Sequence, residues 1–268
     1  MEEKRYSQEQ LVELATRLMK TSGMKEESAA TIARDLVAAD MRGLYSHGVS
    51  RIPMYLKRIE CNCVKPNPGY CCMVYTNSSP ALPVFGGRTT FLGAAPFAAG
   101  MAGGYESPAY VLDMAMTKTA RGKIRVAMIN NEPIAEGLAL DSDGNPTTDA
   151  KKAFEGVCLP FGGPKGAGLA MLMDMLAGMY TGSNYAGDVS SLYYRFDEPK
   201  NLGHMIFIMK ADMFMSMDES KKRMDVYYKR LKSLPKAAGV KEILMPGEPE
   251  DRKTEASKRD GILLSGNI

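Results

Sequence analysis

The sequence predicts an α+β fold, with an N-terminal helical domain packed on a mostly antiparallel sheet domain that also carries helices. Helical spacing of apolar residues is concentrated in the N-terminal region, whereas short strand-like apolar runs come later, at 70–75, 109–113 and 203–209. Separate helical and strand-rich regions are typical of the α+β class. The chain also lacks a glycine-rich turn after an early strand with an acid about 20 residues on, as a Rossmann site requires.

The composition is that of an ordinary soluble protein: 268 residues, 45% of them hydrophobic and 24% charged. A formal charge of +3 without a basic tract gives no reason to expect nucleic acid as a partner. No apolar run reaches the ~18 residues that a membrane-spanning helix needs. The polar start of the chain does not resemble a signal peptide. We therefore expect a cytoplasmic protein without a membrane partner.

The cysteines give no evidence of disulfides or of a metal site. Their number, five, is odd, which argues against a disulfide framework. Cys61, Cys63, Cys71 and Cys72 do not have the paired C-x-x-C spacing of zinc knuckles. Reduced thiols and no bound metal are the expectation.

Three helices are expected in the N-terminal region. Ser7 opens the first, with Gln10 three residues later as its capping-box partner, and Gly23 ends it. The second covers residues 26–42 and the third residues 51–60, each with an apolar stripe at helical spacing.

His47 and Arg51 form the most informative pair of the chain, at the start of the third expected helix. A histidine titrates near neutral pH and is the usual side chain for moving a proton there. The planar guanidinium of an arginine binds a carboxylate through two parallel hydrogen bonds. A proton donor beside a carboxylate-binding group is what the reduction of a 2-oxo acid requires. A plain helix entry, in which His47 is a turn residue and Arg51 a surface charge, is the alternative.

The surrounding residues 40–53 read DMRGLYSHGVSRIP and resemble the signature of the type-2 malate/L-lactate dehydrogenase family. Its relatives include ureidoglycolate and sulfolactate dehydrogenases, diketogulonate reductase and cyclic-imine reductases. The resemblance implies a non-Rossmann fold that binds NAD or NADP, and hydride transfer between the nicotinamide and a small 2-hydroxy or 2-oxo acid. It also implies that His47 donates the proton and that Ser46 and Arg51 bind the substrate.

Three later segments resemble the family's cofactor contacts. Within the first, Asp113 would face the catalytic pocket; the alternative is that it caps a helix that starts there. The implied cofactor-binding residues are Ala109, Tyr110, Val111, Leu112, Asp113, Met114, Ala115, Pro164, Lys165, Gly247, Glu248 and Pro249.

The glycine-rich segment 159–168 is expected to open an apolar helix from about Leu169 to Tyr180. Uncapped N–H groups and Lys165 at a helix start favour a phosphate group. It is not a P-loop, because a glycine and not Ser or Thr follows Lys165. The acidic segment 141–145 is expected to be a surface turn, since it lacks the glutamate that a calcium-binding EF-hand loop needs.

The remaining segments complete the expectation. Residues 203–209 are expected to be an apolar strand in which His204 has a structural role. An amphipathic helix is expected at 220–231 and a solvated helix at 250–259, while residues 121–123 could be a solvated helix end.

The chain departs from the family in one large respect. A block of the cofactor domain that carries a further active-site histidine is missing, with the junction near Pro68–Met73. Ala94 and Ala95 also stand where the family has threonine and asparagine. An alternative is therefore a non-catalytic relative that acts as a structural or dimerisation scaffold, or a gene-model artefact.

The expected organisation has three parts. Residues 1–68 form the helical domain with the catalytic His and Arg, residues 69–225 form the shortened cofactor-binding sheet domain, and residues 226–268 pack back on the helical domain. The resemblance also implies a homodimer, because family members complete their site across a subunit interface.

Overall fold

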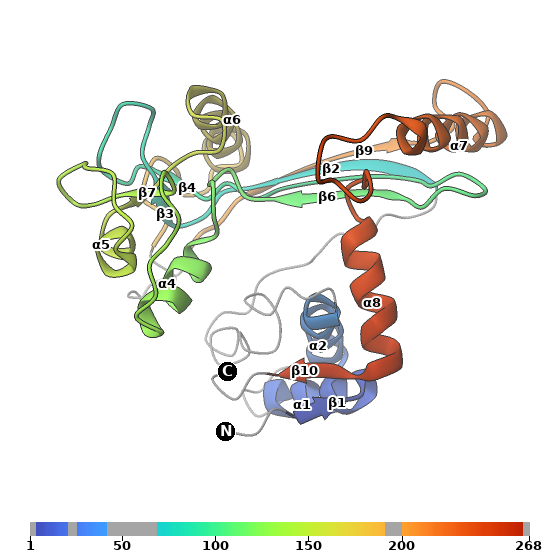
Figure 1. Cartoon of the computed structure of the whole chain (residues 1–268), viewed down its shortest axis with the longest axis horizontal. Coiled ribbons are helices and arrows are strands. Elements are labelled where there is room, and N and C mark those ends of the chain that lie inside the picture. Colours follow the sequence, from blue (N-terminus) through green and yellow to red (C-terminus); the bar gives the residue numbers. More distant parts are fainter. Residues whose placement is uncertain (1–3, 21–25, 42–68, 191–199, 265–268) are drawn as a thin grey trace. The chain divides into compact units, whose positions relative to one another are not determined.

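The computed structural model describes residues 4–20, 26–41, 69–190 and 200–264 (Figure 1). They form two compact units. The described residues of unit 1 fall within 1–65, 103–110 and 221–268, and those of unit 2 within 66–102 and 111–220. Both contain helices and antiparallel strand pairs, so the architecture is α+β as expected.

Unit 1 is built mainly of helices, with one short strand pair. Its elements are β1 (Lys4–Tyr6), α1 (Gln8–Lys20), α2 (Glu26–Met41), the greater part of α7 (Met217–Ser233), α8 (Glu248–Asp260) and β10 (Ile262–Leu264).

The capping box predicted for α1 is confirmed. The Ser7 N–H donates to Gln10 Oε1 at 2.9 Å, and the Gln10 N–H donates to Ser7 Oγ at 3.2 Å. The apolar stripe that follows packs against α2, with its buried members on one side of each helix. The cluster between the two helices consists of Ala15, Met19, Ala29, Ala33 and Leu36. Leu14 and Leu18 of α1 are apolar as well, but they are 50% and 41% exposed.

The two ends of the described chain meet within unit 1. Strand β1 pairs antiparallel with β10, with Lys4 opposite Leu264 and Tyr6 opposite Ile262. Helix α8 packs on α2, and Ser257 Oγ donates to the Met41 carbonyl at 2.9 Å. The C-terminal helix and strand are therefore part of the same core as the N-terminal helices.

The described residues of unit 2 combine a four-stranded sheet with smaller strand pairs and several helices. Its elements are β2 (Tyr70–Thr76), β3 (Pro80–Leu82), β4 (Leu92–Gly93), β5 (Phe97–Met101), β6 (Tyr110–Met114), α4 (Arg121–Ile129), β7 (Ala139–Leu140), α5 (Ala150–Glu155), β8 (Val157–Cys158), α6 (Pro164–Asp174), the π-helical turn η3 (Met175–Met179) and β9 (His204–Lys210).

The main sheet has the strand order β6-β5-β2-β9. Strand β2 is central and antiparallel to both neighbours, with Val74 opposite Ala98 on one side and Ile206 on the other. The prediction of a strand at 70–75 is confirmed, as is the strand at 203–209, which runs from His204 to Lys210. The sheet is largely apolar on both faces.

Much of this sheet remains exposed among the described residues. Strand β2 is half-buried along most of its length, and the edge strand β9 is exposed at most positions although it carries Ile206, Phe207, Ile208 and Met209. Apolar strands of this kind are usually covered.

The core of unit 2 lies among the smaller strands and the helices. Leu82, Leu92, Met116, Ile124 and Met173, all at most 3% exposed, belong to one cluster contributed by several elements. Residues 121–123 were expected to be a solvated helix end, but Arg121 is half-buried. Arg121 begins α4 and donates to the carbonyls of Pro80 and Phe154.

Helix α7, expected to be amphipathic at 220–231, runs from Met217 to Ser233 and has no buried residue, because most of its side chains are charged or long and polar. The third N-terminal helix, expected at 51–60, lies outside the described residues.

Candidate functional site

The first predicted cofactor segment, Ala109–Ala115, contains strand β6 at the edge of the main sheet. Asp113 lies inside this strand, and its side chain is exposed. The alternative that Asp113 caps a helix is wrong, because helix α4 begins only at Arg121, after Ala120. Among the described residues, no hydrogen bond or ion pair engages the Asp113 carboxylate. The group is thus available to a ligand.

Immediately after β6, main-chain hydrogen bonds join three chain segments that the sequence had singled out. The Met116 N–H donates to the Ala94 carbonyl at 2.8 Å, and the Phe161 N–H donates to the Met116 carbonyl at 3.0 Å. The Lys118 N–H donates to the Leu159 carbonyl at 2.8 Å. The glycine-rich segment 159–168 is therefore fixed beside the end of β6. We call this arrangement the β6–α6 junction.

The start of α6 is built from residues that leave its first N–H groups uncapped. Gly162 and Gly163 have φ angles of 59° and 63°, in the region that favours glycine. No side chain caps the helix at Gly163, Pro164 occupies its first turn, and Lys165 follows with an exposed side chain. Such a helix start carries positive partial charge and suits an anionic group.

The expected start of this helix near Leu169 is wrong. The helix begins at Pro164 and continues to Asp174, followed by the π-helical turn η3 up to Met179. The glycines of the segment suggested a loop, although a proline in the first helical turn is itself a common start signal. The correction brings Pro164 and Lys165 into the first turn of the helix.

Gly166 lies where the first turn of α6 approaches the preceding loop closely. A Cβ atom on Gly166 would lie 2.0 Å from the Phe161 carbonyl oxygen, which is far inside van der Waals contact. Only a glycine allows the first turn of α6 to approach the preceding loop in this way.

Two buried hydroxyl groups lie in segments next to the junction. Thr117, 7% exposed, forms a β-bridge with Pro160, and its Oγ1 has no hydrogen-bond partner within the described part of the chain. The same holds for Ser78 Oγ, which lies against Gly93. Unpartnered buried hydroxyls are rare in folded proteins and call for an explanation such as a ligand. Together with Lys165 and the uncapped helix start, they fit a polar, anionic cofactor.

A hollow of about 330 Å³ lies in unit 2, beside the segment that leads into α6. This size is within the range of small-molecule sites. The exposed ring of Phe85 is close to Gly163, so the hollow and the helix start are neighbours. Its lining is Pro83, Val84, Phe85, Gly86, Gly87, Arg88, Leu140, Asp143, Gly144, Leu159 and Pro160.

One wall of this hollow includes the acidic segment 141–145, which is a turn as expected. Asp141 Oδ1 accepts the N–H groups of Asp143 and Asn145 at 3.0 and 2.9 Å. Because these bonds favour the ionised form, the pKa of Asp141 is lowered, with the Asn145 N–H contributing most. No group of residues suited to a metal ion is found among the described residues.

The third predicted cofactor segment, Gly247–Pro249, lies in unit 1 at the start of α8. Gly247 and Glu248 are buried and Pro249 is half-buried. Glu248 accepts hydrogen bonds from within the unit through both carboxylate oxygens. Its side chain is therefore engaged by the protein itself.

The predicted substrate-binding and proton-donating residues Ser46, His47 and Arg51 lie outside the described residues. Sequence reasoning placed His204 in a structural role, and in the structure its Nδ1 is 2.9 Å from Thr76 Oγ1 at the start of β9. Thr117, Tyr228 and Lys232 were not singled out from the sequence. Nothing in their local pattern marks a buried hydroxyl at Thr117 or half-buried polar groups at Tyr228 and Lys232.

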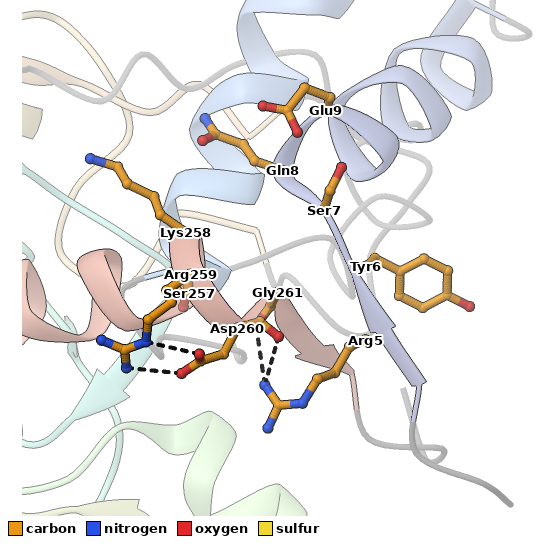
Figure 2. A pocket seen from close by; sticks show the side chains of 10 residues that line it. All are labelled: Arg5, Tyr6, Ser7, Gln8, Glu9, Ser257, Lys258, Arg259, Asp260 and Gly261. Atoms are coloured by element: carbon orange, nitrogen blue, oxygen red, sulfur yellow. Dashed lines mark hydrogen bonds and ion pairs between the residues drawn. The ribbon is translucent and has the colours of Figure 1, made fainter.

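A second, larger hollow of about 560 Å³ lies in unit 1, between the start of α1 and the end of α8 (Figure 2). Arg5 Nη1 donates to the carbonyls of Asp260 and Gly261, and Arg259 forms an ion pair with Asp260. These groups are solvated and satisfied by one another, which gives no sign of a ligand site. None of the described helices is long and apolar enough to cross a membrane.

The chain is similar in sequence to several dehydrogenases. The L-sulfolactate dehydrogenase of Methanocaldococcus jannaschii is 30% identical over 319 residues, which cover 94% of this chain and 90% of the relative. An NAD(+) ureidoglycolate dehydrogenase of Escherichia coli is 26% identical, and the aligned region covers 98% of this chain and 93% of the relative. An NADP(+) (2R)-3-sulfolactate dehydrogenase of Chromohalobacter salexigens is 34% identical over 67% of this chain and 52% of its own.

The fold is that of a solved relative. The structure of sulfolactate dehydrogenase from M. jannaschii superimposes with a TM-score of 0.84, at 30% identity, over 98% of this chain and 94% of that one. The aligned region with the M. jannaschii sequence is 319 positions long, whereas this whole chain has 268 residues. The relative therefore carries internal residues that this chain lacks.

The family match locates that difference. The sequence profile of the malate/L-lactate dehydrogenase family matches residues 6–70 and again 67–268, so the two matched segments meet at 67–70. These residues overlap the expected junction at Pro68–Met73, and Tyr70 is the first residue of β2. The match covers almost the whole chain, which belongs to the malate/L-lactate dehydrogenase family of oxidoreductases.

Proposed function

We propose that this protein is an NAD(P)-dependent oxidoreductase that transfers a hydride between a nicotinamide and a small 2-hydroxy or 2-oxo acid. Family membership gives the reaction class. The observation that carries the proposal is the β6–α6 junction, in which main-chain hydrogen bonds join the residues that follow β6 to the segment that opens the uncapped helix α6 with its lysine. The relatives named for NAD(+) and for NADP(+) support a nicotinamide cofactor without deciding between the two.

In this proposal the β6–α6 junction binds the cofactor. The main chain of Ala109–Ala115 and the residues Pro164 and Lys165 provide its contacts. Lys165 and the first N–H groups of α6 neutralise an anionic group of the cofactor. The main chain of Gly247, Glu248 and Pro249 provides further contacts. The binding fold is of the non-Rossmann type. The bound nicotinamide supplies the hydride chemistry.

The substrate is bound and protonated by residues of the N-terminal region. Arg51 holds the substrate carboxylate through a charge-assisted contact worth about 1.5–3 kcal/mol, and Ser46 assists it. His47 donates a proton to the oxygen at C2 as the alcohol forms, a role worth roughly 10²–10⁴ in rate. Asp113 faces the same pocket.

The proposed protein has three parts along the chain. Residues 1–68 form the domain that carries His47 and Arg51, residues 69–225 form the cofactor-binding domain, and residues 226–268 pack back on the first. We propose a homodimer, since the main sheet exposes apolar residues at its β9 edge. A cytoplasmic location agrees with the odd number of cysteines.

The test is a titration of the purified protein with NADH and with NADPH, followed by nicotinamide fluorescence. We expect saturable binding of one or both and turnover of at least one member of a panel of 2-oxo acids. Lys165→Ala should weaken the binding.

The alternative is a non-catalytic family relative, in which loss of the block at residues 67–70 has abolished cofactor binding. It is motivated by the shorter chain and predicts no binding of either nucleotide at millimolar concentration. That result would refute the proposed enzyme. Sequencing the gene across codons 67–70 separates a true deletion from a gene-model artefact.

A further inference from the structure

The segment that leads into α8 is held in a tight turn. The Glu248 N–H donates to the Met245 carbonyl at 3.1 Å, which closes a β-turn with Pro246 and Gly247 at its corners. Gly247 has a φ of 102°, and Pro followed by a glycine with positive φ is the pattern of a type II turn. We call residues 245–248 the α8 turn.

The Glu248 side chain forms a second hydrogen bond across this turn. Its Oε2 accepts the Met245 N–H at 2.6 Å, so main chain and carboxylate of the same residue bind both polar groups of Met245. Glu248 is only 7% exposed. A buried carboxylate requires hydrogen bonds and a positive partner, and helix α7 supplies them.

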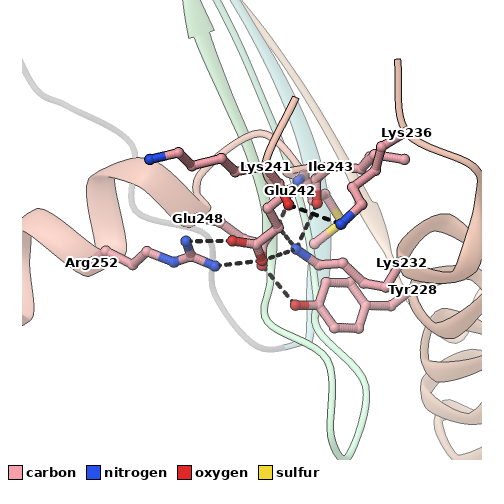
Figure 3. Close-up of polar contacts among 9 residues, drawn as sticks. Tyr228, Lys232, Lys236, Lys241, Glu242, Ile243, Glu248 and Arg252 are labelled. Atoms are coloured by element: carbon pink, nitrogen blue, oxygen red, sulfur yellow. Dashed lines mark hydrogen bonds and ion pairs between the residues drawn. The ribbon is translucent and has the colours of Figure 1, made fainter. Parts of the chain in front are cut away.

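Helix α7 contributes two side chains one helical turn apart, Tyr228 and Lys232 (Figure 3). The Tyr228 hydroxyl donates to Glu248 Oε1 at 2.6 Å, and Lys232 Nζ donates to Glu248 Oε2 at 2.8 Å. Lys232 Nζ also donates to the Ile243 carbonyl at 2.8 Å and to Glu242 Oε1 at 3.0 Å. An ammonium group has three N–H donors, so each has an acceptor in this network.

The ionisation states agree with a closed network. Desolvation disfavours the charged form of Glu248, but the hydrogen bonds from Lys232, Tyr228 and Met245 outweigh it and lower the pKa of that carboxyl. For Lys232, desolvation is likewise outweighed by Glu248 and Glu242, which raise its pKa. The pair is therefore charged around neutral pH.

An outer ion pair continues the network to α8. Arg252 donates to both oxygens of Glu242 at 2.7 Å, and these bonds, with a further one from Lys232, lower the pKa of Glu242 to about 2. Helix α7, the segment before the turn and helix α8 are thus tied together through side chains.

We infer that Glu248 is a positioning residue, which with Lys232 and Tyr228 fixes the α8 turn in the conformation that presents Gly247 and Pro249 to the cofactor. This inference rests on the proposed function. Because every polar atom of the Glu248 carboxylate is already engaged, the side chain does not bind the ligand. It acts through the turn.

The test compares cofactor binding by the full chain and by three variants. Glu248→Gln keeps the size of the side chain and removes its charge, and we expect the dissociation constant for NADH or NADPH to rise about tenfold. Tyr228→Phe removes one hydrogen bond and should give a smaller rise of about threefold. The matched control is Ile262→Val, a core substitution in β10 of the same unit, where Ile262 belongs to a cluster with Leu11, Val37 and Met41.

A steady-state measurement separates positioning from general destabilisation. In Glu248→Gln the KM for the cofactor should rise while kcat and the KM for the 2-oxo acid stay unchanged. Ile262→Val should lower the melting temperature and leave the cofactor KM where it was. If the wild type binds nucleotide and Glu248→Gln and Tyr228→Phe bind it equally well, the inference is wrong and the proposed function stands. If the wild type binds neither nucleotide, both are wrong.

Discussion

The carboxylate of Asp174 in α6 accepts the N–H of Ala186 at 2.8 Å, and Ala186 has a φ of 52°, which is unusual for a residue other than glycine. Asp174 is 6% exposed. Burial raises its pKa, and the hydrogen bond from Ala186 offsets this only in part. Burial therefore disfavours the ionised form of Asp174, while its carboxylate fixes the loop at Ala186 through a hydrogen bond.

A raised pKa in the folded state means that the contribution of Asp174 to stability is fully present below its unfolded pKa of 3.8 and is lost as the pH rises through the folded value. Asp174→Asn keeps an acceptor for Ala186 without the charge. We expect it to raise the melting temperature by about 2–4 °C at pH 7 and to change it little at pH 3. The exposed Asp212→Asn serves as control. A lower melting temperature for Asp174→Asn at pH 7 would contradict this account.

Asp225 on α7 predicts the opposite pH dependence. Its carboxylate accepts the N–H groups of Tyr105, Glu106 and Ser107 and the Ser107 hydroxyl, at 2.9–3.0 Å. Partial desolvation opposes ionisation, but these bonds outweigh it and lower the pKa to about 2.

The stabilisation by Asp225 is therefore present above its unfolded pKa of 3.8 and is lost as the pH falls through about 2. Asp225→Asn should be less stable than the wild type in urea at pH 7, and the difference should shrink between pH 4 and pH 2. Ser107→Ala, which removes one of the donors, should cost less. An equal loss at both ends of the pH range would mean that the charge is irrelevant.

Two glycines of α6 give a matched pair for the β6–α6 junction. Gly166→Ala places a methyl group against the Phe161 carbonyl, whereas a Cβ on Gly168 meets nothing within 4 Å. We expect Gly166→Ala to displace the helix start and to weaken cofactor binding at least about tenfold. Gly168→Ala should leave binding unchanged and add about 0.5–1 kcal/mol of stability. Equal binding by both variants would show that the junction is not part of the cofactor site.

His47 and Arg51 should leave different kinetic marks. His47→Ala should lower kcat by about 10²–10⁴ with little change in KM, since proton donation matters only in the transition state. Arg51→Lys keeps the charge and loses the bidentate fork, so it should mainly raise the KM for the 2-oxo acid. Cofactor affinity should be unaffected in both. Unchanged turnover in His47→Ala would contradict the proposed mechanism and favour the alternative, in which His47 is a turn residue and Arg51 a surface charge.

The oligomeric state tests the exposed sheet. Within the described residues, Ile206, Phe207, Ile208 and Met209 of the edge strand β9 are each at least 42% exposed. Such edges attract a partner. We expect light scattering to show a homodimer, and Ile208→Lys to shift it toward the monomer. A monodisperse wild-type monomer would argue against both the dimer and a site completed across an interface.

Local signals predicted the elements whose structure depends on neighbours in the sequence. Ser7 and Gln10 identified the start of α1, and the apolar run at 70–75 identified β2, because capping and strand patterning are local. Asp113 was ambiguous, since an aspartate at the end of an apolar run is also a common N-cap. Its place inside an edge strand depends on pairing with β5.

The polar networks could not have been predicted in this way. Asp225 binds a loop more than a hundred residues earlier in the chain, and Glu248 is satisfied by residues of a different helix. Neither partner is within the range of a local pattern. The family resemblance marked residues 247–249 as functional, but only the packing of α7 shows that the Glu248 side chain is turned inward.

The pairing of β1 with β10 has a consequence for synthesis on the ribosome. Residues 4–6 find their strand partners only at residues 262–264, and α2 packs on α8. The central strand β2 likewise cannot pair with β9 until β9 has been synthesised, because residue 76 lies opposite residue 204. Neither unit can close before most of the chain has been translated, so the early helices and β2 emerge with apolar surface uncovered. Until then, this exposed apolar surface favours aggregation of the nascent chain.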